Sequence, residues 1–182
     1  MSYNVTIDQN VSVAPLLTGK VELMAECVRY SLRVKPQDRE QFNKAGNLLL
    51  PAGIGQTSIQ NDHRIFCVGP DDYILIDKSS EQKSLIRQFK ELGDKFTFSV
   101  TDISHRNVGF KLSGPHAVKM INVGCPLDLS LQHFPVGKCT RTIFENAEIM
   151  IFREEENEFQ LETWWSFAPY MARYFEKYYQ GK

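Results

Sequence analysis

The sequence predicts an α+β fold, in which helices pack on mostly antiparallel sheets. Short segments with strand character outnumber the helical segments along the 182 residues. Several of these strand segments follow one another across tight turns, which is typical of hairpins and therefore of antiparallel pairing. A series of strands and one helix also occurs twice, over 64–93 and 97–124, which indicates two similar halves.

The composition excludes several classes of protein. Apolar residues make up 42% and charged residues 24% of the chain, as in globular rather than disordered proteins. The formal net charge of −1 argues against a general nucleic-acid binder, which needs a basic face for phosphates. No window approaches a membrane-spanning length of apolar residues, and the first residues lack the pattern of a secretion signal. We therefore expect a cytoplasmic protein that binds neither a membrane nor nucleic acid.

Four cysteines, at positions 27, 67, 125 and 139, are too far apart for a C-x-x-C motif. A chain of this length can bury a sizeable core without disulfides. We therefore expect reduced and mostly buried thiols, as in other proteins of reducing compartments.

The chain begins with a polar stretch, 1–18, which we expect to be an N-terminal arm before one domain over 19–182. Residues 28–34 alternate between apolar and polar side chains, which predicts a half-buried strand. Asp38 then precedes a short helix over 39–46 with a cap at each end. The next segment is predicted to be a loop because it contains Pro51, Gly53 and Gly55.

A hairpin and a helix are predicted next. Segments 64–68 and 73–77 have strand character, and a Gly-Pro-Asp-Asp turn joins them. Ser79 or Ser80 opens a helix that ends at Gly93. We expect this helix to lie across the hairpin, because one of its faces carries Leu85, Ile86, Phe89 and Leu92.

Two further strands, at 97–103 and 108–112, precede the third helix. Pro115 suits the first position of that helix, where its missing N–H costs nothing, and Gly124 stops the helix. A structured loop with two prolines follows over 125–137.

The C-terminal part predicts a hairpin, a charged turn, a strand and a helix. The hairpin strands are 139–144 and 147–152, and 153–158 (REEENE) is expected to be a solvated turn. The last strand covers 159–165, and Ser166 caps the terminal helix. That helix tolerates Pro169 in its first turn and has a broad aromatic face with Tyr170, Met171, Tyr174, Phe175 and Tyr178.

Trp164 and Trp165 end the last strand. Adjacent residues of a strand point to opposite faces, so the two rings cannot enter the same core. They either pack in the interior or anchor an interface, where tryptophan and arginine are favoured. At least one of them should meet a helix on the other face, a groove or another subunit.

Asp102, Ser104 and His105 contain the residue types of a hydrolytic triad. Neighbours on one short segment cannot easily orient one another as nucleophile, base and orienter, and no G-x-S-x-G motif is present. We expect instead a strand-end turn in which Asp102 or Ser104 binds backbone N–H groups.

The sequence also lacks signatures for metals and nucleotides. The four histidines, at 63, 105, 116 and 133, have no i,i+4 partner, and no zinc spacing occurs. Neither a G-x-G-x-x-G nor a G-K-[ST] motif is present. We expect no catalytic residue, metal ion or cofactor in this chain.

Arg106 and Arg141 each lie among turn and strand residues. A guanidinium group recognises a carboxylate at two points. Each arginine could hold a ligand carboxylate, an acidic residue of this chain or an acidic residue of a partner, and the sequence leaves all three open.

Several longer motifs follow one another in the chain. They are Thr101-Asp102-Ile103-Ser104-His105-Arg106, Leu112-Ser113-Gly114-Pro115, Gly124-Cys125-Pro126-Leu127-Asp128-Leu129, Phe134-Pro135-Val136-Gly137-Lys138-Cys139-Thr140-Arg141-Thr142 and Trp165-Ser166-Phe167-Ala168-Pro169-Tyr170. Together with the hairpin segment 69–76, these motifs resemble the gamma subunit of heterotetrameric sarcosine oxidase. The resemblance runs from about residue 60 to the end, and the N-terminal third matches only in its strand-loop-helix outline.

This resemblance implies two interleaved sheet-and-helix units, roughly 60–93 and 97–182, similar to the folate-binding part of the glycine-cleavage aminomethyltransferase. It implies a complex that oxidatively demethylates sarcosine to glycine, reduces dioxygen to hydrogen peroxide and yields formaldehyde or 5,10-methylenetetrahydrofolate. The implied partners are alpha, beta and delta subunits. The resemblance places FAD, FMN and NAD in the alpha and beta subunits and zinc in the delta subunit.

On this basis we expect a non-catalytic structural subunit whose candidate partner contacts are Arg106, Arg141, Trp164, Trp165 and His105. Two alternatives stay open. One is a stand-alone tetrahydrofolate-binding protein with Arg106 or Arg141 on the folate glutamate tail. The other is the gamma subunit of a related complex that oxidises another N-methylated amino acid, such as N-methylglutamate.

Overall fold

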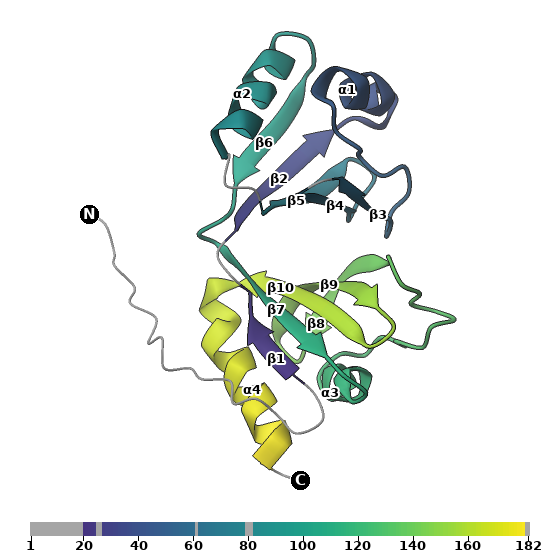
Figure 1. Ribbon diagram of the computed structural model, residues 1–182, viewed down its shortest axis with the longest axis vertical. Coiled ribbons are helices and arrows are strands. Elements are labelled where there is room, and N and C mark those ends of the chain that lie inside the picture. Colours follow the sequence, from purple (N-terminus) through teal and green to yellow (C-terminus); the bar gives the residue numbers. More distant parts are fainter. Residues whose placement is uncertain (1–19, 25–26, 61, 79–81, 181–182) are drawn as a thin grey trace, which may run out of the picture.

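Two five-stranded antiparallel sheets and four helices form the fold, as the computed structural model in Figure 1 shows for residues 20–24, 27–60, 62–78 and 82–180. The N-terminal sheet has the order β3 (Thr57–Gln60), β4 (His63–Cys67), β5 (Asp72–Asp77), β2 (Val28–Val34) and β6 (Phe98–Asp102). The C-terminal sheet has the order β1 (Lys20–Leu23), β7 (Asn107–Ser113), β10 (Glu158–Trp164), β9 (Ala147–Glu155) and β8 (Cys139–Phe144). The predicted α+β class with antiparallel sheets is confirmed, and the predicted arm, 1–18, lies outside the described residues.

The sheets stack face to face, and each carries its helices on the outer side (Figure 1). The helices are α1 (Arg39–Gly46), α2 (Gln82–Gly93), α3 (Ala117–Asn122) and α4 (Ala168–Gln180). Helices α1 and α2 pack their apolar side chains on the N-terminal sheet, and α3 and α4 pack theirs on the C-terminal sheet. A third apolar cluster lies between the sheets and consists of Phe66, Ile74, Ile76, Cys139, Met150 and Phe152.

The two units exchange strands along the chain. Strand β1 comes first in the sequence but pairs with β7 in the C-terminal sheet, whereas β2 to β6 form the N-terminal sheet. The chain then passes back from β6 to β7 (Figure 1). The two units are therefore interleaved. Strands β1 and β3, with four residues each, are too short for alternation to predict them from the sequence.

The predicted hairpin and its helix are present in the N-terminal unit. Strands β4 and β5 pair from His63↔Asp77 to Cys67↔Tyr73. Helix α2 buries Leu85, Phe89 and Leu92 against this sheet, but Ile86 is 44% exposed, so its predicted place on the buried face is wrong. Ile86 follows Leu85 by one residue, which turns its side chain about 100° away from the buried stripe. The predicted start of this helix at Ser79 or Ser80 lies outside the described residues.

Several predicted helix ends differ from the observed ones. Asp38 makes no side-chain hydrogen bond at the start of α1, and the left-handed residue after that helix is Asn47, with φ of 43°. Helix α3 begins at Ala117, two residues after Pro115, and Gly114 before that proline takes a φ of 104°. Helix α4 begins at Ala168 after a short 3₁₀ turn over Trp165–Phe167 that contains Ser166, so Ser166 does not cap it.

The predicted solvated turn at 153–158 is wrong at its first residues, because β9 extends to Glu155 and Arg153 is buried. Its Nη1 donates to the Leu129 carbonyl at 2.9 Å and to the Phe134 carbonyl at 2.5 Å. The guanidinium carbon also lies 4.8 Å from the centre of the Phe159 ring. Burial lowers the pKa of Arg153. The arginine thus holds the 125–137 loop to the sheet through backbone acceptors, which a charged sequence pattern does not reveal.

None of the helices in the described ranges is long and apolar enough to cross a membrane.

Candidate functional site

A cavity of about 540 Å³ opens at one end of the layer between the two sheets. Its walls come from the β6–β7 turn, the start of β7, and strands β5, β8, β9 and β10. The lining residues are Ile74, Arg106, Asn107, Arg141, Thr142, Ile143, Glu148, Ile149, Met150, Glu162, Thr163 and Trp164. The structure thus brings together three of the five residues that the sequence singles out as partner contacts, although they are far apart in the chain.

Arg141 reaches from β8 across to the N-terminal sheet. Its Nη1 lies 2.7 Å from Oδ2 of Asp72, a nearly buried carboxylate that also accepts a hydrogen bond from Arg33 Nη2 at 3.3 Å. The Arg141 side chain remains 52% exposed. Arg141 thus binds an acidic residue of this chain, which is one of the three partners that the sequence left open. One edge of its guanidinium group is still accessible from the cavity.

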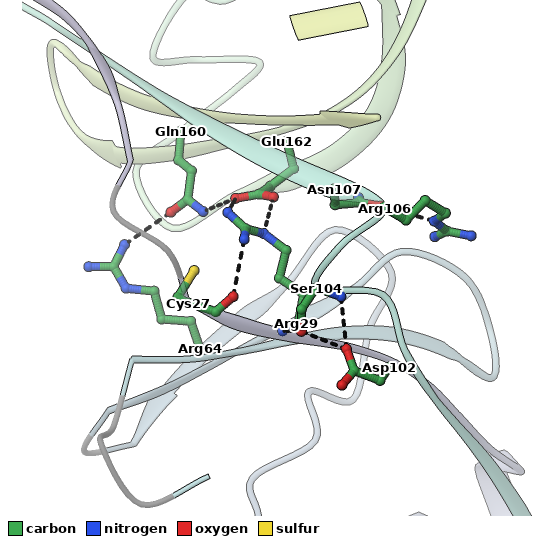
Figure 2. Close-up of polar contacts among 9 residues, drawn as sticks. All are labelled: Cys27, Arg29, Arg64, Asp102, Ser104, Arg106, Asn107, Gln160 and Glu162. Atoms are coloured by element: carbon green, nitrogen blue, oxygen red, sulfur yellow. Dashed lines mark hydrogen bonds and ion pairs between the residues drawn. The ribbon is translucent and has the colours of Figure 1, made fainter. Parts of the chain in front are cut away.

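Arg106 lies in the turn between β6 and β7, and its side chain points away from Arg29 and Glu162 (Figure 2). Its Nε donates to Oδ1 of the buried Asn107 at 3.0 Å, and its carbonyl accepts the Trp165 N–H at 2.8 Å. Its two terminal nitrogens have no partner among the described residues. The backbone of Arg106 is therefore fixed while its charge stays free for a carboxylate from outside this chain.

The two tryptophans have different surroundings. Trp164 is 44% exposed and lines the cavity, with its ring centre 6.2 Å from that of Phe167. Trp165 lies in the 3₁₀ turn and packs against the core of the C-terminal unit. One ring thus faces a hollow on the surface, as the sequence predicts for at least one of them. A partner contact through either ring stays a prediction.

A buried ion pair joins the two sheets beside the cavity (Figure 2). Arg29 Nε of β2 lies 2.6 Å from Glu162 Oε2 of β10, and their side chains are only 4% and 1% exposed. Gln160 Nε2 donates to Glu162 Oε1 at 2.8 Å, and Arg29 Nη1 donates to the Cys27 carbonyl at 3.2 Å. Burial alone would lower the pKa of Arg29, but the attraction of Glu162 and the hydrogen bond with it raise that pKa overall.

Further polar contacts between the two sheets extend from Gln160. Arg64 of β4 donates to Gln160 Oε1 at 3.4 Å and forms an ion pair with Glu154 of β9. The hydrogen bond from Arg64 lowers the pKa of Glu154. These residues, together with Arg29 and Glu162, fasten one sheet to the other. The sequence did not indicate these residues. A strand face covered by a second sheet shows the same alternation of apolar and polar residues as a face that meets water.

Gly109 of β7 lies opposite Glu162 in the sheet and makes room for the buried pair. A Cβ atom at this position would lie 2.5 Å from Glu162 Oε1, 2.7 Å from Met24 Sδ and 3.2 Å from Arg29 Nη2. No side chain fits at such distances without displacing a charged group. The glycine is therefore required by the close approach of the ion pair.

The segment that contains Asp102, Ser104 and His105 forms a turn, as the sequence predicts. Asp102 Oδ1 accepts the Ser104 N–H at 2.9 Å and the Ser104 hydroxyl at 2.6 Å, and Ser104 Oγ accepts the Arg29 N–H at 3.0 Å. These hydrogen bonds, the hydroxyl first, lower the pKa of Asp102. His105 is exposed, and in the described part of the chain it makes no hydrogen bond with Ser104. The serine thus supports the β2 backbone, and among the described residues its hydroxyl donates to Asp102 and contacts no histidine.

The histidine and cysteine side chains were the remaining candidates for a metal site. No group of three or more His, Cys, Asp or Glu side chains suited to a metal ion occurs among the described residues. All four cysteines are free, three of them are buried, and Cys27 is partly buried. Burial raises the pKa of the Cys27, Cys67 and Cys139 thiols, which makes them poor nucleophiles. The prediction of free, mostly buried thiols is confirmed.

Comparison with known proteins decides the family. The model of the sarcosine oxidase, gamma subunit family matches residues 41–179, which is well over half of the chain. The chain belongs to the sarcosine oxidase gamma subunit family. A curated member, the sarcosine oxidase subunit gamma of Corynebacterium sp. (strain U-96), is 24% identical over 113 residues, which cover 62% of this chain and 54% of the relative. The match thus spans about half the length of that relative.

Solved structures confirm the fold of this gamma-family chain. A chain of the heterotetrameric sarcosine oxidase from Corynebacterium sp. U-96, in complex with pyrrole 2-carboxylate, superposes with a TM-score of 0.80 at 20% identity, covering 92% of this chain and 86% of that one. The glycine cleavage system aminomethyltransferase T from Bartonella henselae gives 0.67 at 12% identity, covering 88% of this chain and 46% of that one. The expected resemblance to the aminomethyltransferase fold is therefore correct.

Proposed function

We propose that this chain is a non-catalytic structural subunit of a heterotetrameric sarcosine oxidase complex. The match to the gamma subunit family over 41–179 carries this proposal. The structure supports it because the conspicuous polar residues of the chain fasten its own sheets or cap its own turns. The exposed cavity with Arg106, Arg141 and Trp164 supplies a surface for a neighbouring subunit.

In this proposal the complex oxidatively demethylates sarcosine to glycine and produces hydrogen peroxide, with formaldehyde or 5,10-methylenetetrahydrofolate as the one-carbon product. The alpha and beta subunits hold FAD, FMN and NAD, and the delta subunit holds zinc. This chain contributes shape and contacts to the assembly. The four free thiols support a reducing compartment, the cytoplasm, for the complex.

Co-expression tests the proposal. The chain is produced with the alpha, beta and delta subunits of its own complex, and the purified assembly is weighed by native mass spectrometry and assayed with sarcosine. We expect one copy of the chain in the assembly and loss of assembly when the chain is omitted. A fully active and correctly assembled complex without the chain would contradict the proposal.

One observation favours a second candidate function, a stand-alone tetrahydrofolate-binding protein. The cavity places Arg106 and Arg141 on one hollow of ligand-like size, with the Trp164 ring beside them. In this case the arginines would hold the carboxylates of the folate glutamate tail. Calorimetric titration of the isolated chain with tetrahydrofolate separates the two candidates, because absence of heat at millimolar ligand removes this one.

A further inference from the structure

In the part of the chain that the structure describes, strand β8 is an edge of the C-terminal sheet and pairs only with β9. The Cys139 N–H donates to the Gly55 carbonyl at 2.9 Å, and the Glu145 N–H donates to the Gly124 carbonyl at 2.7 Å. Both N–H groups thus point away from β9. Backbone groups of an antiparallel strand alternate in direction, so Arg141 and Ile143 also point their N–H groups outward. In the described part of the chain these two N–H groups have no partner.

The free part of the edge is therefore Arg141–Ile143, bounded at one end by Gly55 and at the other by Gly124. The Arg141 carbonyl accepts the Thr140 hydroxyl at 3.3 Å, a contact that an incoming donor can replace. Unpaired edge groups of this kind are the usual template for the addition of a strand from another chain.

The cavity next to this free edge is lined by side chains that are suited to an interface. Ile143 is 48% exposed and Trp164 is 44% exposed, and both line the cavity. Arg106 and Arg141 line the same cavity. We name these four residues, Arg106, Arg141, Ile143 and Trp164, the β8 edge surface. It combines aromatic, aliphatic and arginine side chains, which are the types that anchor interfaces.

The charges decide which occupant fits. The terminal nitrogens of Arg106 have no partner among the described residues, and Arg141 shares Asp72 with Arg33, so both can bind a further carboxylate. Within β8 itself the only charged residue is Arg141. A second copy of β8 would therefore bring another arginine to the edge and no carboxylate to bind Arg141. The exposed Glu148 of β9 lies opposite Ile143, and its negative charge disfavours a carboxylate at that position. An uncharged side chain therefore fits beside Ile143.

We propose that the β8 edge surface binds an extended segment of another subunit of the complex as a sixth strand. This inference rests on the proposed function. The segment pairs its backbone with Arg141 and Ile143, places a carboxylate side chain beside Arg141 and an apolar side chain beside Ile143, and offers a second carboxylate to Arg106. Because the free edge is three residues long, the side chains at Arg106 and Trp164 supply much of the specificity.

The backbone contribution is tested with Ile143→Pro in the full chain, co-expressed with the alpha, beta and delta subunits. Proline removes the outward N–H of an edge strand and leaves the ladder to β9 intact. We expect the association constant for the remaining subunits to fall by at least about tenfold, since strand addition depends on main-chain hydrogen bonds. Ile143→Val, which keeps the N–H, should assemble like the wild type.

The charge contribution is tested with Arg106→Glu at an exposed position, a change that also removes the Nε hydrogen bond to Asn107. We expect a loss of about tenfold or more, and a weaker dependence of association on salt than in the wild type. Arg106→Lys keeps the charge and should lose less. Circular dichroism of each variant confirms that it is folded.

The outcomes separate this inference from the proposed function. If the wild-type chain does not join the other subunits, both are overturned. If it joins them and Ile143→Pro and Arg106→Glu join equally well, only the strand addition is overturned. A homodimer of the isolated chain that Ile143→Pro dissociates would also overturn it, because the occupant would be a second copy.

Discussion

At the scale of single residues, the absence of a side chain at Gly109 sets how closely the two sheets approach. A Cβ atom there would collide with Glu162 and Met24. We expect Gly109→Ala to lower the free energy of unfolding by about 1–3 kcal/mol, the usual cost of overpacking. Urea unfolding followed by circular dichroism measures it. Gly93→Ala is the matched control, because its Cβ would have no heavy atom within 4 Å and should cost nothing.

Glu162 is the residue on which the buried ion pair depends. Glu162→Gln leaves the Arg29 guanidinium buried without a counter-charge, since the pair is almost fully shielded from water. Removing one partner of a buried pair costs about 3–5 kcal/mol, and the same unfolding measurement should show a loss of this order. Glu148→Gln, on an exposed position of the neighbouring strand, should change stability by less than about 0.5 kcal/mol. Equal losses in the two variants would mean that the pair does not hold the sheets together.

Glu154 gives the stability a dependence on pH. The hydrogen bond from Arg64 lowers its pKa in the folded state below the ordinary value of 4.5. The contact therefore stabilises the fold fully above pH 4.5 and less as the pH falls through the lower, folded pKa. We expect Glu154→Gln to destabilise the protein at pH 7 and to differ less from the wild type at pH 3. Chemical unfolding at the two pH values checks this. Glu155→Gln, next to it and exposed, should show no such trend.

At the scale of elements, helix α2 shows how narrow a buried stripe can be. Leu85 is 2% exposed and its neighbour Ile86 is 44% exposed. Leu85→Ala should therefore lower the free energy of unfolding by about 2–5 kcal/mol. Ile86→Ala removes a side chain of equal size from the water-facing side and should change it by less than about 0.5 kcal/mol. Thermal or urea unfolding of both variants distinguishes this arrangement from one in which both residues face the sheet.

Sequence patterns predicted elements well where one face is apolar and the turn is tight. The β4–β5 hairpin and helix α1 lie within one or two residues of their predicted bounds. Patterns failed where the element is very short, as in β1 and β3, or where a charge is buried, as at Arg153. In the last case Arg153 binds the nearby Glu156 carbonyl and also the Leu129 and Phe134 carbonyls of a distant loop. It is the distant loop that covers the side chain, so no local pattern could indicate its burial.

At the scale of the whole molecule, the shared strands and the polar layer between the sheets should make the chain unfold as one unit. Both tryptophans lie in the C-terminal unit, whereas far-ultraviolet circular dichroism reports both units. We expect the two signals to give the same midpoint during thermal unfolding, as in a two-state transition. A fluorescence midpoint several degrees away from the circular dichroism midpoint would show that the units melt separately.

The candidate site also belongs to the scale of the whole molecule. Arg106, Arg141 and Trp164 were recognised singly from their residue types, and only the stacking of the sheets places them on one cavity. The sequence could not indicate Arg29 and Glu162, because they look like solvent-facing residues of two alternating strands. The second sheet buries them, and no single segment of the sequence predicts that the two sheets stack.

The place of β1 has a consequence for synthesis of the chain on the ribosome. This strand emerges first, yet its partner β7 follows some ninety residues later. Strand β1 therefore stays unpaired while β2 to β6 are synthesised. The closure of such a long loop is slow compared with local hairpin formation. During that interval the sheet that receives β1 does not exist, and the nascent chain is exposed to chaperones. Translation pauses between β6 and β7 would lengthen this interval and lower the yield of folded protein.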